Sequence, residues 1–305
     1  MKEPQDVPFE KEGQYLKSDN RSNISYFLEH NVLLRRFTLS VGVLANYNSA
    51  LNEGIHFYPG IDASYRIGDN VRLYGSWNRA LRMPTFTDLY YEGKTNKGNP
   101  DLKPEESEAF EVGLKYNTYF LRAHIAGFYR KGKNMIDWVK EKPEDIWESQ
   151  NLTKVDNLGF ETNLSLLPRE LGNERFFIRK IELGYAFIHQ DKDSEGYISN
   201  YALDYLKHKF TAQLSHSIWK GFSATWYVRW QDRAGSYTKY ENLKPAYEEP
   251  YAPYCLVDMK VNWEYQRLNL YAELNNLLNS TYYDLGNIPQ PGIWFKAGFR
   301  YSFKY

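Results

Sequence analysis

The residue types that most often carry catalysis or bind metal ions are few in this chain and lie far apart. The six histidines form no HExxH motif, and the single cysteine, Cys255, leaves no paired Cys/His spacing of the kind that holds a metal ion. The histidines are His30, His56, His124, His189, His208 and His216. The last two share the apolar phase of one predicted strand, which favours interface positions over metal ligation. We therefore predict no metal site, no cofactor and no catalytic residue.

Four carboxylates close together in sequence suggest a second kind of chemistry, because an acidic cluster at a rim could serve a hydrolase. They are Glu105, Glu106, Glu108 and Glu111. A solvated polar face explains such a run better. No GxSxG or phosphate-binding glycine-rich motif is present. Lys plus Arg and Asp plus Glu both number 38, and no basic cluster indicates nucleic-acid binding.

Aromatic side chains are the residues best suited to bind a ligand. The chain contains 27 Tyr and 8 Trp, and several lie in or beside connections predicted to be long. Their rings could stack on the flat parts of a ligand, or could equally pack the connections against one another. Arg82 adds a guanidinium suited to anions, although an ion pair with Asp88 or Glu92 that anchors the loop is the favoured role. The candidate ligand contacts are Arg82, Tyr90, Tyr91, Trp138, Trp147, Tyr237 and Tyr240.

The elements that must position these residues are β-strands. Residues 295–305 alternate strictly between an almost wholly aromatic face and a polar face. Side chains at i and i+2 share a face of a strand, and a membrane-spanning strand needs roughly 9 to 11 residues. The same period of two recurs upstream, whereas the helical period is hardly seen. The runs predict about thirteen strands: 23–34, 37–47, 55–67, 71–79, 110–116, 119–130, 153–167, 175–189, 205–218, 222–231, 255–264, 267–278 and 295–305.

The connections between these strands alternate between short and long. The longest are 79–104, 131–151, 190–204, 234–253 and 279–292. Membrane barrels have short turns on one side and longer loops on the other, whereas Greek-key sandwiches have no reason to sort their connections in this way. Mean hydropathy is −0.66, as expected when a polar lumen face halves the apolar signal of every strand. The chain is therefore predicted to be all-β and to form a transmembrane antiparallel up-and-down β-barrel. A carbohydrate-binding β-protein is the weaker interpretation.

The N-terminal residues 1–20 are polar and contain no apolar core of a signal peptide. An odd count of about thirteen strands also departs from the even counts of single-chain bacterial barrels. We therefore expect residues 1–305 to be the C-terminal part of a larger barrel domain.

Two stretches carry an ordered set of short motifs. In the first, RALRMPTFTDLY at 79–90 is followed by GNPDLKPE at 98–105 and EVGL at 111–114. In the second, NNLLN at 275–279 precedes YYD at 282–284, PQPG at 289–292 and the aromatic final strand, which ends on Tyr305. This order and spacing resemble the TonB-dependent outer-membrane receptors. Asp88 and Ile293 stand where the family more often has Glu and Arg, which weakens any assignment to a subfamily.

The resemblance implies a 22-stranded barrel, plugged by an N-terminal globular domain, in the outer membrane of a Gram-negative bacterium. Such a receptor imports a scarce, large ligand, here cobalamin or a ferric siderophore, with energy relayed by TonB. This chain would supply roughly the last thirteen strands, with the plug, the TonB box and the signal peptide absent. It would act with the TonB complex through the missing N-terminal region, outer-membrane lipid and a surface lipoprotein. The alternatives are a passive porin and, less favoured, an outer-membrane hydrolase.

Overall fold

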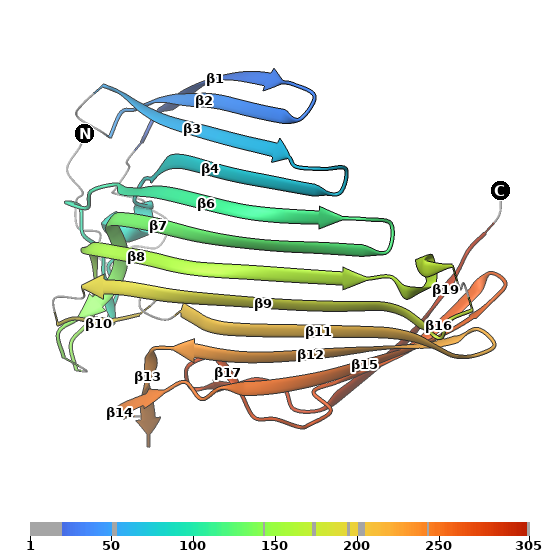
Figure 1. Cartoon of the computed structure of the whole chain (residues 1–305). Helices are drawn as coiled ribbons and strands as arrows, with labels where there is room; N and C mark the ends of the chain where they lie inside the picture. The colour runs from blue at the N-terminus through green and yellow to red at the C-terminus, as the bar shows by residue number, and fades with distance from the viewer. Residues whose placement is uncertain are drawn as a thin grey trace.

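The computed structural model describes residues 20–50, 54–142, 144–172, 175–193, 196–200, 205–242 and 244–303. Its main feature is an antiparallel sheet in which thirteen strands follow one another in chain order (Figure 1). The strands are β1 (Asn23–Leu33), β2 (Phe37–Asn48), β3 (Ile55–Arg66), β4 (Val71–Arg82), β6 (Glu105–Asn117), β7 (Leu121–Lys140), β8 (Trp147–Leu166), β9 (Ile178–Asp193), β11 (Tyr205–Trp219), β12 (Phe222–Ala234), β15 (Tyr254–Tyr265), β16 (Leu268–Asn275) and β19 (Trp294–Tyr301). The predicted all-β antiparallel meander of about thirteen strands is confirmed.

The sheet has one apolar and one polar face because side chains alternate along each strand. Between β16 and β19, Leu270 lies opposite Phe299 on one face, whereas Glu273 lies opposite Lys296 on the other. The side chain of Phe299 is 74% exposed. An aromatic side chain so exposed suits contact with lipid acyl chains rather than water. Tyr305 lies outside the described residues.

The sheet is an open, curved surface (Figure 1). Its polar face contains two hollows. One hollow of about 620 Å³ is lined by polar side chains that include Arg122 and Glu182. A second hollow, of about 1000 Å³, is lined by residues that include Glu273. The Glu273 carboxylate forms ion pairs with Lys260 Nζ at 2.7 Å and with Lys296 Nζ at 2.5 Å. In the described part of the chain β1 and β19 each pair with a single neighbour, so they form the two edges of the sheet.

The smaller elements lie mainly in the connections at one end of the strands. These are α1 (Phe86–Tyr90), β5 (Asn96–Lys97), β10 (Ile198–Ser199), β13 (Ser236–Glu241), β14 (Lys244–Pro250), β17 (Tyr283–Leu285) and β18 (Ile288–Pro289); η1 (Pro168–Leu171) lies in the connection between β8 and β9. We call the end that bears α1, β5, β10, β13 and β14 the rim. None of the helices described is long and apolar enough to cross a membrane.

Two predicted loops are largely β-structure: the segment 234–253 contains the β13–β14 hairpin, and the segment 131–151 belongs mostly to β7 and β8. The sequence places a long loop at 131–151, but β7 continues to Lys140 and β8 begins at Trp147, so the loop prediction is wrong for most of this segment. Each strand has 20 residues, about twice the length that crosses a bilayer. The alternation between apolar and polar residues fades beyond the membrane because both faces of the hairpin then contact water. The backbone hydrogen bonds between the two strands do not depend on that alternation, so the pairing continues.

Candidate functional site

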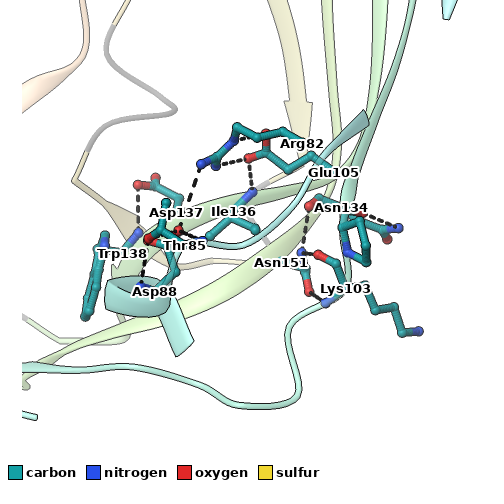
Figure 2. Close-up of polar contacts among 11 residues, drawn as sticks. Arg82, Thr85, Asp88, Lys103, Glu105, Asn134, Ile136, Asp137, Trp138 and Asn151 are labelled. Atoms are coloured by element: carbon teal, nitrogen blue, oxygen red, sulfur yellow. Dashed lines mark hydrogen bonds and ion pairs between the residues drawn. The ribbon is translucent and has the colours of Figure 1, made fainter. Parts of the chain in front are cut away.

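The first part of the candidate site is an anchor where the 83–104 connection leaves and rejoins the sheet (Figure 2). Arg82, the last residue of β4, donates from Nε and Nη2 to the two carboxylate oxygens of Glu105, each at 2.5 Å. Glu105 opens β6 and is only 8% exposed. Its Oε1 also accepts the backbone N–H of Ile136 in β7 at 2.8 Å. One buried carboxylate therefore ties β4, β6 and the β7–β8 hairpin together.

Asp88 joins this anchor to α1. Its carboxylate lies 3.9 Å from the Arg82 guanidinium and accepts the backbone N–H of Thr85 at 2.9 Å. The Thr85 hydroxyl in turn accepts the Asp88 N–H at 3.1 Å, which completes a capping box. The predicted Arg82–Asp88 ion pair is confirmed. Arg79 instead lies 3.7 Å from Glu106 and 3.5 Å from Glu108.

The far end of the same connection is fixed by an asparagine amide. Asn151 of β8 accepts the Lys103 N–H at 2.8 Å and donates to the Lys103 carbonyl at 2.9 Å. It also donates to the carbonyl of Asn134 at 2.6 Å (Figure 2). Asn134 adopts a φ of 52°, a left-handed conformation that asparagine tolerates. The 83–104 connection is thus held to the β7–β8 hairpin at both ends.

Three of the predicted ligand contacts lie next to this anchor and touch other rings. Tyr90, the last residue of α1, stacks on Phe86 with ring centroids 6.3 Å apart. Tyr91 meets Trp138 of β7 edge-to-face at 6.3 Å, and β5 pairs with the start of β8. The Tyr91–Trp138 contact packs one predicted loop against another, which is one of the two roles predicted for these aromatics, whereas the Tyr90–Phe86 contact lies within α1.

A rim pocket of about 300 Å³ brings the other three predicted aromatics together. It is lined by Trp147 at the start of β8 and by Tyr237 and Tyr240 of β13. Its remaining walls come from β10, β14, the end of β12 and the β17–β18 turn. β10 reaches the pocket because it pairs with β7 at Val139 and Lys140.

Two cations in this pocket lie over aromatic rings. The Lys140 ammonium sits 4.5 Å from the centroid of Trp147, and the Arg233 guanidinium sits 5.2 Å from that of Tyr251. Burial lowers the pKa of Lys140, while nearby carboxylates, the nearest in effect being that of Glu248, oppose the shift. The Glu248 carboxylate accepts the hydroxyls of two other lining residues, Ser236 at 3.0 Å and Thr238 at 2.5 Å.

Tyr237 and Tyr240 are held differently. The Tyr237 ring lies 5.1 Å from Tyr251, and its hydroxyl donates to Glu249 at 3.1 Å. Burial, together with that carboxylate, raises the pKa of Tyr237. Tyr240 is fixed through its backbone, whose N–H donates to Asn287 Oδ1 at 3.3 Å, while its side chain stays 52% exposed. Tyr240 is therefore a positioned but accessible ring.

Several residues of the two sites escape prediction. The sequence suggests a solvated acidic face for Glu105, but this carboxylate is buried and paired, because β6 begins there beneath the β7–β8 hairpin. Lys140 and Arg233 end their strands and belong to no motif. Among the residues that the structure describes, no group of three or more His, Cys, Asp or Glu side chains could hold a metal ion.

Comparisons with known proteins agree with this architecture. The family model described as "TonB dependent receptor-like, beta-barrel" matches residues 4–277. The chain is 25% identical over 191 residues to the vitamin B12 transporter BtuB of Vibrio vulnificus, covering 57% of this chain and 30% of that protein. It is 22% identical over 297 residues to the ferrienterobactin receptor of Escherichia coli, covering 88% and 38%.

Solved structures show the same fold. A crystal structure of a mutant ferric enterobactin receptor from Pseudomonas aeruginosa superposes with a TM-score of 0.71 at 20% identity, covering 93% of this chain and 45% of that one. The chain thus spans about a third of the length of the curated relatives and about half of the solved structure.

Proposed function

This chain belongs to the TonB-dependent receptor β-barrel family, and from that premise we propose that it is part of a receptor for energised uptake of a scarce, large ligand. It is a β-barrel segment of the outer membrane of Gram-negative bacteria. In the proposal it supplies about thirteen strands of a 22-stranded barrel whose plug and TonB-contact segment belong to the remainder of such a receptor.

The observation that carries the proposal is the family match over residues 4–277, which contain twelve of the thirteen strands of the meander. The rim adds support, because the connections there are tied to one another and form a pocket lined by aromatic and charged side chains. Loops held over a strand scaffold are the usual place for ligand recognition. The membership also favours a receptor over the porin and hydrolase alternatives.

The proposed ligand is cobalamin or a ferric siderophore, supported by a relative called a vitamin B12 transporter and another called a ferrienterobactin receptor. The chain is no more than 25% identical to either relative and covers about a third of the length of each. We therefore keep both ligands in the proposal. The TonB complex, outer-membrane lipid and a surface lipoprotein are the proposed partners. Arg82 and the six aromatic candidates stay predicted ligand contacts.

Uptake by cells tests the proposal. The full-length receptor that contains this chain is produced in a Gram-negative strain without cobalamin or siderophore receptors, and accumulation of labelled cyanocobalamin and of a labelled ferric siderophore is measured. We expect one ligand to accumulate, and accumulation to stop when the proton-motive force is collapsed or TonB is deleted. Entry that persists without energy would instead support the porin, and no specific accumulation of either ligand would overturn the ligand assignment.

A further inference from the structure

We propose that the rim pocket binds a flat aryl group that bears a negative charge, such as an aryl carboxylate. The inference rests on the proposed function, since it specifies which part of an imported ligand the rim recognises. It is carried by the charges, rings and volume of the pocket described above.

The first step is the charge of the pocket. Lys140 and Arg233 are its cations, and Glu248 is its only carboxylate among the described lining residues. Asp145 and Glu144, which do not line the pocket, also act on Lys140, so the charge available to a ligand is that of Arg233. Arg233 is half-buried as a residue, its guanidinium lies over the Tyr251 ring, and it forms no ion pair with the described part of the chain. A partly desolvated guanidinium strengthens electrostatic attraction, and its planar fork matches a carboxylate. A neutral or cationic group would leave this charge without compensation.

The second step is the aromatic surface. Four rings line the pocket, those of Trp147, Tyr237, Tyr240 and Tyr251. Tyr237 is immobilised, because Gly286 of the β17–β18 turn packs so closely that an added Cβ would lie 2.4 Å from the Tyr237 Cβ. Tyr240 offers an exposed ring on a fixed backbone. Fixed rings beside a cation suit an aryl anion, which stacks while its charge meets the guanidinium.

The third step separates an aryl anion from a sugar, which also stacks on aromatic rings but needs many hydrogen-bonding groups. Those of this pocket are largely engaged. Asn287 donates to the Thr238 carbonyl at 2.7 Å and accepts from the Tyr240 N–H, while Glu248 accepts two hydroxyls. An aromatic ring with one charged substituent needs fewer free hydrogen-bonding groups in the pocket than a polyhydroxylated ring does.

The fourth step is size. A volume of about 300 Å³ is at the lower limit of ligand pockets, which run from roughly 300 to 1,000 Å³. One substituted aromatic ring fits, whereas a large metal complex or corrinoid does not. The pocket would therefore hold one arm of a larger ligand at the rim.

Three small probes test the proposal on the full-length receptor in detergent, with binding followed by saturation-transfer NMR. Salicylate is an aryl anion, 2-hydroxybenzyl alcohol is its neutral analogue, and cyclohexanecarboxylate is an anion without an aromatic ring. We expect salicylate to bind at least tenfold more tightly than either of the others. Equal binding of salicylate and its neutral analogue would overturn the proposal.

Variants locate the binding. Arg233→Gln should weaken salicylate about tenfold and leave 2-hydroxybenzyl alcohol unchanged, a difference that general unfolding cannot produce. Tyr240→Ala should weaken both aryl probes. The matched control is Tyr247→Ala, because Tyr247 of β14 is similarly exposed at 53% but is not among the residues that line the pocket. Loss of binding in the control alone, or no effect of Arg233→Gln, would refute the assignment.

Uptake separates this inference from the proposed function. If Arg233→Gln leaves both salicylate binding and uptake unchanged while the unsubstituted receptor still transports, the pocket assignment fails and the function stands. If the unsubstituted receptor binds salicylate in an Arg233-dependent way but accumulates neither ligand, the proposed transport fails and the pocket chemistry stands.

Discussion

Removing the Arg82 guanidinium should detach the 83–104 connection while leaving the sheet intact. In Arg82→Ala, Glu105 loses two of its three described hydrogen bonds and keeps the one from the Ile136 N–H. Its side chain is only 10% exposed, so the carboxylate becomes a poorly compensated buried charge. The structure relieves that charge most easily by lifting this carboxylate and the adjoining connection into water.

The cost follows from the burial of the two partners. Breaking a buried ion pair on one side costs about 3–5 kcal/mol. The Arg82 side chain is 49% exposed, so water can enter the vacated space, and we expect the lower value of about 2–3 kcal/mol. At about 1.4 kcal/mol per tenfold change, local opening becomes roughly 30- to 150-fold more frequent.

Hydrogen–deuterium exchange on the full-length receptor in detergent measures this opening. Exchange of the Ile136 amide and of the α1 amides should accelerate by that factor, with little change in β11 or β12. Arg79→Ala is the matched control, because Arg79 lies on the same strand and also pairs with glutamates, yet all three side chains are at least 38% exposed. Such surface pairs contribute about 0–1 kcal/mol, so exchange should barely change.

The double substitution Arg82→Met with Glu105→Leu sharpens the test. Replacing a buried pair by apolar side chains of similar volume is often neutral, so slow exchange of the α1 amides should return in large part. The Ile136 amide should stay fast, because Glu105→Leu removes the carboxylate that accepts its N–H. If Arg82→Ala and Arg79→Ala accelerate exchange equally, or if Arg82→Ala accelerates it no more than twofold, burial of the carboxylate is not what anchors the connection.

Two further predictions concern the sheet and the rim. Gly298→Val should lower the thermal unfolding temperature by an amount equivalent to about 1–3 kcal/mol, since an added Cβ would lie 2.5 Å from Tyr271 Oη. The control Gly68→Ala should leave the unfolding temperature unchanged, because a Cβ added at Gly68 meets no atom within 4 Å. Equal unfolding temperatures of the two variants would contradict this prediction. The Lys239 ammonium, 2.6 Å from Glu249, lowers the pKa of Glu249, so the stabilisation is complete above the ordinary carboxyl pKa of 4.5 and is lost as pH falls through the lower folded value. Limited proteolysis of the β13–β14 hairpin should therefore increase in acid. Lys239→Met should weaken that dependence, while the hydrogen bond from the Tyr237 hydroxyl to Glu249 preserves part of it. An unchanged dependence in Lys239→Met would refute the prediction.

The sheet was predictable because the pattern that specifies each strand lies within that strand's own sequence. Whether residue 270 or 271 faces lipid follows from alternation alone, and the pairing of Leu270 with Phe299 is consistent with it. The turns at one end are short, so each strand has a single convenient partner, the next in the chain. An ion pair of Arg82 with Asp88 or Glu92 was also predictable, because these residues are close in sequence, and the structure contains the pair with Asp88.

The rim was less predictable because its contacts join residues distant in sequence. Glu105 meets the Ile136 amide 31 positions away, and Asn287 meets Tyr240 47 positions away. Beyond the bilayer no apolar face is required, so the pattern that marks strands fades where β7 and β8 continue. The sequence could select Trp147, Tyr237 and Tyr240 by residue type, but it could not select Lys140 or Arg233.

The two parts of the candidate site are physically linked through the β7–β8 hairpin. Glu105 holds the Ile136 N–H, and four residues further along the same strand Lys140 pairs with Ile198 of β10 in the wall of the pocket. A strand transmits displacement along its length better than a loop does, and β7 is paired with β8 from Met135 to Val139. We therefore expect the Glu105 anchor to position Lys140 over Trp147 as well as to hold the 83–104 connection. Arg82→Ala should weaken salicylate binding at the pocket even though Arg82 does not line it, whereas Arg79→Ala should not. Unchanged salicylate binding in Arg82→Ala, with Ile136 exchange accelerated, would show that the anchor and the pocket are independent.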